Sequence, residues 1–307
     1  MTFGILGVGD AVPALHRGLS TAGIECAFVA SMAAAALPEG LTPINTWALD
    51  TGAPFITLDS ANSTEFIDWV VGHPSDMLFV VWPEVLSAEV LSLFPRGCIG
   101  THPTCLPYGR GRHPLHWSIV LGLDFMCMSF LILDTGIDTG DVVLRVPIEV
   151  GASPSIQELL KASWAAAEVG AETLGRCVIA NNGWPRPLVS SMTQTYWPRR
   201  YPADLQLDPR MSVESLCRLQ RSFSEPFDGA TLVCEEGEFR IASLYLSSHD
   251  YDPDEVAHTA IGTILRTSER NLDLRVDDGV VSIELLLPLP LSLARGLRIL
   301  PPAHYFR

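Results

Sequence analysis

The sequence predicts an α/β protein with a mainly parallel sheet, followed by a smaller β-rich domain of open-barrel character. In the first part of the chain, short apolar runs alternate with segments of helical period, an order that favours parallel strands with helices on both faces. Beyond a proline-rich stretch, strand-like runs follow one another closely. We therefore expect a first domain over residues 1–183, a linker over 184–209, and a second domain with a packed tail over 210–307.

The chain opens with a strand, a turn and a helix, which is typical of a Rossmann-like fold. Phe3 begins a buried apolar run, and Gly7-Val8-Gly9 makes the turn. The third glycine of the dinucleotide fingerprint is replaced by Val12, so we interpret the turn as structural. The other elements expected before residue 97 are helices at 12–22, 47–51, 63–71 and 87–94 and strands at 27–30, 54–56 and 77–82.

Further helices and strands are expected after residue 97. Glu158 in the first turn of a long amphipathic segment favours a helix over 156–180. Before it we expect a short apolar run at 98–99, a helix at 114–121, and strands at 126–133 and 142–150. In the second domain we expect a helix at 212–221 and strands at 231–234, 238–246, 260–266, 272–276 and 280–286.

Charge narrows the classes of partner. The chain of 307 residues has a net charge of −15, and from residue 201 onward it holds ten arginines, no lysine and seventeen carboxylates. A tRNA or DNA binder needs basic surface to neutralise phosphates, so we predict no nucleic-acid partner. A few local arginines are enough for an anionic small molecule.

The seven cysteines show no CxxC pair and no framework spacing. This pattern favours reduced thiols in a cytoplasmic protein and gives no sign of a metal site. No apolar run reaches 18 residues, and the first residues lack the pattern of a signal peptide, so we predict no contact with a membrane.

The most informative stretch runs from Gly97 to Val143. An apolar run ends at His102, and a second one, 126–133, ends in a loop that carries Asp134, Asp138 and Asp141. Ligands of open α/β sheets bind at the carboxyl ends of strands. A histidine and aspartates at two such ends indicate general acid–base chemistry.

These residues also resemble a known family. His102-Pro-Thr-Cys-Leu-Pro-Tyr-Gly-Arg-Gly, with Asp138-Thr-Gly-Asp 36 residues after the histidine, is similar to folate-dependent formyltransferases. That family has Asn-x-His-x-Ser-Leu-Leu-Pro-x-x-Arg-Gly and then Asp-Thr-Gly-Asp. Arg112, Pro114 and Trp117 resemble its sugar-modifying branch, as does the Pro-Arg-Arg of the linker.

The resemblance implies that 10-formyltetrahydrofolate is the formyl donor, that no metal takes part, and that the acceptor is a dTDP- or UDP-linked amino sugar. His102 would act as base or acid, with Asp138 supporting it. Residues implied around them are Thr104, Arg110, Arg112 and Trp117 for loop support or substrate, and Trp82, Val85, Leu86, Leu133 and Asp134 for the pterin.

Gly100 departs from the family, which has asparagine two residues before the histidine. Loss of that amide leaves three alternatives: a slow enzyme, a different donor such as Thr101, Thr104 or a backbone N–H, or a site that binds without reacting or transfers another group. The acceptor also stays open between an amino sugar and an amino acid, peptide or antibiotic intermediate. A folate- or nucleotide-binding pseudoenzyme is the alternative of another class, and a homodimer is left open.

Overall fold

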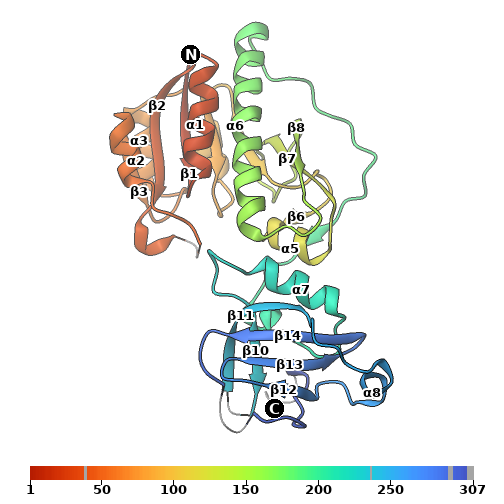
Figure 1. Cartoon of the computed structure of the whole chain (residues 1–307). Helices are drawn as coiled ribbons and strands as arrows, with labels where there is room; N and C mark the ends of the chain where they lie inside the picture. Colours follow the sequence, from red (N-terminus) through yellow and green to blue (C-terminus); the bar gives the residue numbers. More distant parts are fainter. Residues whose placement is uncertain (38–39, 236, 290–292, 303–307) are drawn as a thin grey trace. The chain divides into compact units, whose positions relative to one another are not determined.

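The computed structural model describes residues 1–37, 40–235, 237–289 and 293–302, in two compact units (Figure 1). The first unit comprises Met1–Leu115, Asp124–Ala152 and Glu158–Arg199, and the remaining residues belong to the second. The predicted fold class is confirmed: the first unit is α/β and the second is built on an antiparallel sheet. The domain limits at 183 and 209 remain predictions, and the expected tail lies partly outside the described residues.

The first unit is organised around a seven-stranded sheet of order β3-β2-β1-β4-β5-β7-β8. Its first five strands are parallel and β7 is antiparallel to both of its neighbours, β5 and β8, which agrees with a mainly parallel sheet. The strands are β1 (Thr2–Gly7), β2 (Glu25–Met32), β3 (Phe55–Leu58), β4 (Met77–Val81), β5 (Cys98–His102), β7 (Phe125–Ile132) and β8 (Val142–Glu149).

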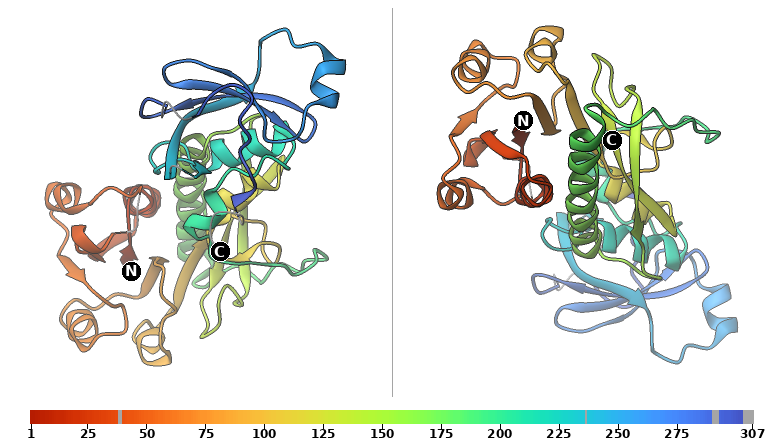
Figure 2. Two further views of the ribbon diagram at one scale, coloured as in Figure 1. Left: turned by 90° about the horizontal axis from the view of Figure 1, so that it is seen from below. Right: turned by 90° about the horizontal axis from the view of Figure 1, so that it is seen from above.

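Helices cover both faces of this sheet. Ser63 and Ser87 start two of them, because their side chains accept hydrogen bonds from backbone N–H groups three residues later. On the other face α6 lies beside α1 (Figure 2), with Gly18 against its backbone. The helices of the first unit are α1 (Ala11–Thr21), α2 (Asn45–Thr51), α3 (Thr64–Gly72), α4 (Ala88–Ser92) and α6 (Ile156–Asn181), whereas most of α5 (Pro114–Val120) belongs to the second unit.

A two-stranded ladder was not expected from the sequence. β6 (Arg110–Gly111) pairs in parallel with β9 (Tyr196–Trp197). β9 lies within the stretch that we predicted to be a linker, and it belongs to the first unit. The proline-rich segment therefore returns to the loop that follows His102.

The second unit contains a five-stranded antiparallel sheet of order β10-β11-β14-β13-β12. Leu216 and Leu219 of α7 (Val213–Ser222) pack into its apolar core. The short helix α8 (Pro253–His258) was missed by the sequence analysis. The strands are β10 (Thr231–Cys234), β11 (Gly237–Leu246), β12 (Ile264–Thr267), β13 (Asn271–Val276) and β14 (Gly279–Leu285). Within the described residues, no helix has the length and hydropathy needed to cross a membrane.

Candidate active site

His102 and Asp138 lie together at one edge of the first unit's sheet. His102 is the last residue of β5, and Asp138 belongs to the loop between the neighbouring strands β7 and β8. His102 Nδ1 is 3.6 Å from Asp138 Oδ2, and the two side chains are 8% and 20% exposed. The structure thus places the two residues of the motif as a pair that forms an ion pair when the imidazole is protonated.

The other ring nitrogen of His102 has a different partner. His102 Nε2 lies 2.8 Å from the carbonyl oxygen of Gly109. A carbonyl oxygen only accepts, so Nε2 carries the hydrogen in this bond. In the neutral ring the lone pair is therefore on Nδ1, the nitrogen that faces Asp138. Asp138 Oδ2 also accepts a hydrogen bond of 2.9 Å from the Gly111 N–H.

Gly100 is closely covered by an apolar side chain. A Cβ atom at this position would lie 2.5 Å from Leu133 Cδ2 and 3.3 Å from Leu131 Cδ2. Space that a larger side chain would need is therefore filled by Leu133. Of the replacement donors considered for Gly100, Thr104 is already committed, because its hydroxyl donates to the Gly109 carbonyl at 3.3 Å.

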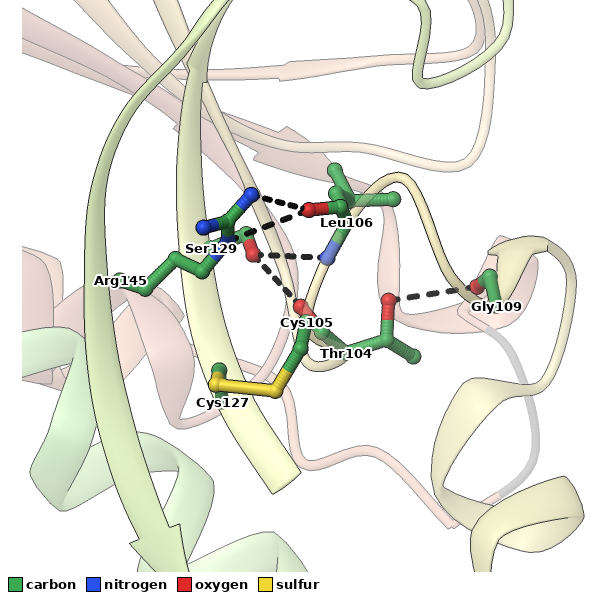
Figure 3. Close-up of a disulfide and its surroundings, with 7 residues drawn as sticks. All are labelled: Thr104, Cys105, Leu106, Gly109, Cys127, Ser129 and Arg145. Atoms are coloured by element: carbon green, nitrogen blue, oxygen red, sulfur yellow. Dashed lines mark hydrogen bonds between the residues drawn. A yellow bond between two sulfur atoms is a disulfide. The ribbon is translucent and has the colours of Figure 1, made fainter. Parts of the chain in front are cut away.

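The loop that follows His102 is fastened to strands β7 and β8 (Figure 3). Ser129 Oγ donates to the Thr104 carbonyl at 2.6 Å and accepts from Leu106 N at 3.2 Å. Arg145 Nε and Nη2 both donate to the Leu106 carbonyl. These bonds pair backbone N–H and C=O groups of a buried loop. Such groups cost free energy when they are buried without a hydrogen-bond partner.

A disulfide adds to this attachment. Cys105 of the same loop is bonded to Cys127 of β7. The expectation that all cysteines are reduced thiols is therefore wrong for these two. Their separation of 22 residues shows no pattern, but pairing of His102 with Ser129 in the antiparallel ladder brings the two segments side by side.

The residues expected near the pterin lie in and around one apolar cluster of the first unit. Trp82 and Leu133 pack against a buried cluster that contains Leu86, and Val85 is 41% exposed. Asp134 is engaged within its own turn, because its Oδ1 accepts hydrogen bonds from Gly136 N and Thr139 Oγ1. Its carboxylate shapes the turn.

Glu84, between Trp82 and Val85, was missed by the sequence analysis. Its carboxylate accepts hydrogen bonds from Ser60 Oγ, Ala61 N, Asn62 Nδ2 and Trp82 Nε1. Burial acts to raise the pKa of Glu84, but these donors together lower it below its usual value. Glu84 therefore fixes the loop after β4 as a carboxylate.

The arginines and Trp117 have separate environments. Arg112 Nη1 donates to the Pro83 carbonyl at 2.8 Å and so joins the loop after β4 to the loop after His102. Arg110 Nη1 donates to Gln194 Oε1, while its buried Nε has no hydrogen-bond partner among the described residues. Trp117 is in the second unit, where its ring lies 4.9 Å from the guanidinium carbon of Arg200.

Several residues that hold the site could not be found from the motif. Ser129 and Arg145 are on strands whose pattern indicates only apolar or alternating positions. Thr195 lies in the proline-rich stretch and accepts a hydrogen bond from Gly109 N. Glu84 could have been suspected from the sequence, because it is a carboxylate among apolar residues shortly after a buried strand.

Comparisons with known proteins find relatives of both parts of the chain. The profile of the formyl transferase family matches residues 57–171, and the profile of the formyl transferase C-terminal domain matches 201–289. A methionyl-tRNA formyltransferase of Clostridioides difficile is 25% identical over 248 residues, which are 80% of this chain and 77% of the relative.

Two solved structures share the fold. WlaRD, a sugar 3N-formyltransferase studied with dTDP and 5-N-formyl-THF, has a TM-score of 0.67 at 13% identity, over 94% of this chain and 99% of its own. An N-formyltransferase from Helicobacter canadensis, in complex with folinic acid and dTDP-3-aminofucose, has a TM-score of 0.64 at 13% identity, over 93% and 99%. At such identity the likeness is one of fold.

Proposed function

The chain belongs to the formyl transferase family and is thus a one-carbon transferase, and from that premise we propose that it formylates the amine of a nucleotide-linked amino sugar with 10-formyltetrahydrofolate. The observation that supports this most is the pairing of His102 Nδ1 with Asp138, 3.6 Å apart. An imidazole next to a carboxylate can accept a proton near neutral pH and is stabilised once charged.

The proposed reaction is an acyl transfer. The nitrogen lone pair of the neutral acceptor amine attacks the formyl carbon, and the carbonyl electron pair moves to oxygen. The amine proton passes to His102 Nδ1, beside Asp138. When the carbonyl re-forms, the bond from the formyl carbon to the donor nitrogen breaks and that nitrogen takes the proton from His102. The products are a formamide and tetrahydrofolate.

Charge on the intermediate needs stabilisation that Gly100 cannot supply. A positioned amide donor is typically worth about 10²–10³ in rate. Thr104 donates to the Gly109 carbonyl, whereas Thr101 and backbone N–H groups stay open as donors. We assign proton transfer to His102, which adds electrostatic stabilisation once it has taken the amine proton beside Asp138.

The donor's ring system suits the apolar surface after β4. Trp82 and Leu133 give partly buried contact area over the buried Leu86, and Val85 adds exposed apolar surface. Glu84 and Arg112 hold the backbone of this loop in place. A pterin needs such a slot together with backbone hydrogen bonds at its edge. Two proteins of similar fold were studied with formylated folates.

The charge of the chain favours a small molecule as the acceptor. The segment from residue 201 onward carries a net charge of −7 without a single lysine. A surface of this kind repels the phosphates of tRNA. The second candidate acceptor is methionyl-tRNA, which the similarity to methionyl-tRNA formyltransferases favours.

A direct assay separates these candidates. The purified protein is incubated with 10-formyltetrahydrofolate and, in parallel, dTDP- and UDP-linked amino sugars, free amino acids, and methionyl-tRNA, and mass spectrometry detects the formyl group on each product. We expect formylation of a nucleotide amino sugar. Formyl transfer to methionyl-tRNA alone would exclude the sugar proposal, and folate binding without transfer to any amine would indicate a pseudoenzyme.

A further inference from the structure

The stretch 194–197, within the expected linker, encloses the loop that follows His102. β9 runs beside β6, and Arg112 N donates to the Trp197 carbonyl at 3.0 Å. The ring of Trp197 is buried and meets Tyr108 edge to face at 5.5 Å. A side chain on Gly111, whose φ is +110°, would collide with the Trp197 carbonyl, so glycine is needed for this close approach.

Thr195 makes three of the contacts in this enclosure. Its N–H donates to the Pro107 carbonyl at 3.3 Å, and its own carbonyl accepts from Arg110 N at 3.1 Å. Its hydroxyl oxygen accepts a hydrogen bond of 2.7 Å from Gly109 N. Only the third contact depends on the side chain, which makes it accessible to mutation without loss of the other two.

The Gly109 peptide group connects Thr195 to the imidazole. Its N–H is held by Thr195, and its carbonyl oxygen accepts from His102 Nε2 at 2.8 Å. The position of that carbonyl decides which nitrogen of the neutral ring carries hydrogen. With the carbonyl in place, hydrogen stays on Nε2 and the lone pair on Nδ1 faces Asp138. If the carbonyl moves away, the carboxylate favours hydrogen on Nδ1, and the base is blocked.

We propose that Thr195 is a positioning residue: through the Gly109 peptide it keeps His102 in the tautomer whose Nδ1 accepts the proton of the attacking amine. This role rests on the proposed function for its catalytic meaning, but the tautomer itself can be measured without substrate. It also gives a reason for the return of the proline-rich segment to the first unit.

The decisive experiment compares Thr195→Val, which removes the hydroxyl at nearly constant shape, with Thr195→Ser, which keeps it. For Thr195→Val we expect kcat for formyl transfer to fall about tenfold with KM for the folate little changed. A loss of this size is typical when a hydrogen-bond partner that orients a site residue is removed. Thr195→Ser should retain most of the wild-type rate. Nitrogen-15 chemical shifts of His102, recorded near pH 8 without substrate, should show a larger share of hydrogen on Nδ1 in Thr195→Val only.

The matched control is Thr173→Val on the exposed side of α6, where the lost hydroxyl donates only to the Val169 carbonyl. It should leave rate and nitrogen shifts unchanged.

Equal tautomer populations in wild type and Thr195→Val would overturn the proposal, as would a loss of rate in Thr195→Ser equal to that in Thr195→Val. If Thr195→Val does not fold, the same measurements on Thr195→Ala and Thr195→Ser decide. A changed tautomer in a protein that formylates no amine would instead refute the proposed function and leave the role of Thr195 intact.

Discussion

The two loops that meet in the active site are held in different ways. The loop after His102 is attached to neighbouring segments by the disulfide, by Ser129 and Arg145, and by Thr195. The loop that carries Asp138 is mostly held by its own atoms, through the hydrogen bonds that Asp134 accepts from residues of the same turn. Between the two loops, Gly111 N donates a hydrogen bond to Asp138 Oδ2.

This difference predicts that mutations in the two loops affect stability and turnover to different extents. The base is fixed by contacts that also stabilise the fold, so changes around it should affect both unfolding and turnover. The carboxylate is supported by an exposed turn, so changes there should act on turnover with little effect on unfolding. Mutations in the two loops can test that division.

The largest effect should come from the pair itself. His102→Ala removes the proton acceptor and should lower kcat about 10³-fold, within the range of general acid–base catalysis. Asp138→Asn should cause a comparable loss, and the double variant should be little worse than either, because residues that act as a unit are not additive. Steady-state kinetics and folate titration measure this, with Asp124→Asn on the exposed surface as control. Additive losses would argue against a pair.

The alternation of apolar and helical segments was sufficient to predict the fold class, and the motif was sufficient to bring His102 and Asp138 together. It succeeded because His102 ends one apolar run and Asp138 lies in the loop after another, and neighbouring strand ends meet at one edge of a sheet. Spacing could not reveal Cys105–Cys127, the return of Thr195, or the contact of Leu133 with Gly100. Each of these depends on which strands pair and in what register, and that is set by the packing of distant segments.

Removal of the disulfide should weaken the histidine loop most. A bond that closes a loop of 22 residues is worth about 3 kcal/mol of stability. We therefore expect the double variant Cys105→Ser/Cys127→Ser to lose about 3 kcal/mol in chemical denaturation. Cys177→Ser, which removes a free cysteine of α6, should lose far less. Titration of the unfolded, unreduced protein should find five thiols, and a result of seven would contradict the cross-link.

Gly100→Asn tests whether the family's amide can simply be restored. The new Cβ would lie 2.5 Å from Leu133 Cδ2, so Leu133 must leave its place in the apolar surface. We expect kcat/KM to fall about tenfold, in line with the loss of well-packed apolar contact. Gly100→Asn/Leu133→Ala removes the collision and should be faster than Gly100→Asn alone. An increase in rate for Gly100→Asn by itself would show that Leu133 yields easily and that the glycine is a defect.

Acidification should loosen the loop after β4. The pKa of Glu84 in the folded protein lies below its ordinary value of 4.5, so its hydrogen bonds contribute stability in full above that value. The contribution is lost as pH falls through the folded pKa. The difference in unfolding free energy between wild type and Glu84→Gln should therefore be constant from pH 7 to about pH 5.5 and shrink below about pH 4.5. A difference that grows on acidification would contradict the lowered pKa.

The smallest effect tests the comparison most directly, because the same substitution can be made in both loops. Thr104→Val removes a buried hydroxyl that donates to the Gly109 carbonyl, and we expect a loss of about 1 kcal/mol in unfolding free energy. Thr139→Val removes an exposed hydroxyl that donates to Asp134, and unfolding should change by about 0.5 kcal/mol or less. Turnover should still fall severalfold in Thr139→Val, because the turn that presents Asp138 loses a bond. Equal losses of stability in the two variants would mean that the aspartate loop is as firmly held as the histidine loop, and the division between them would not stand.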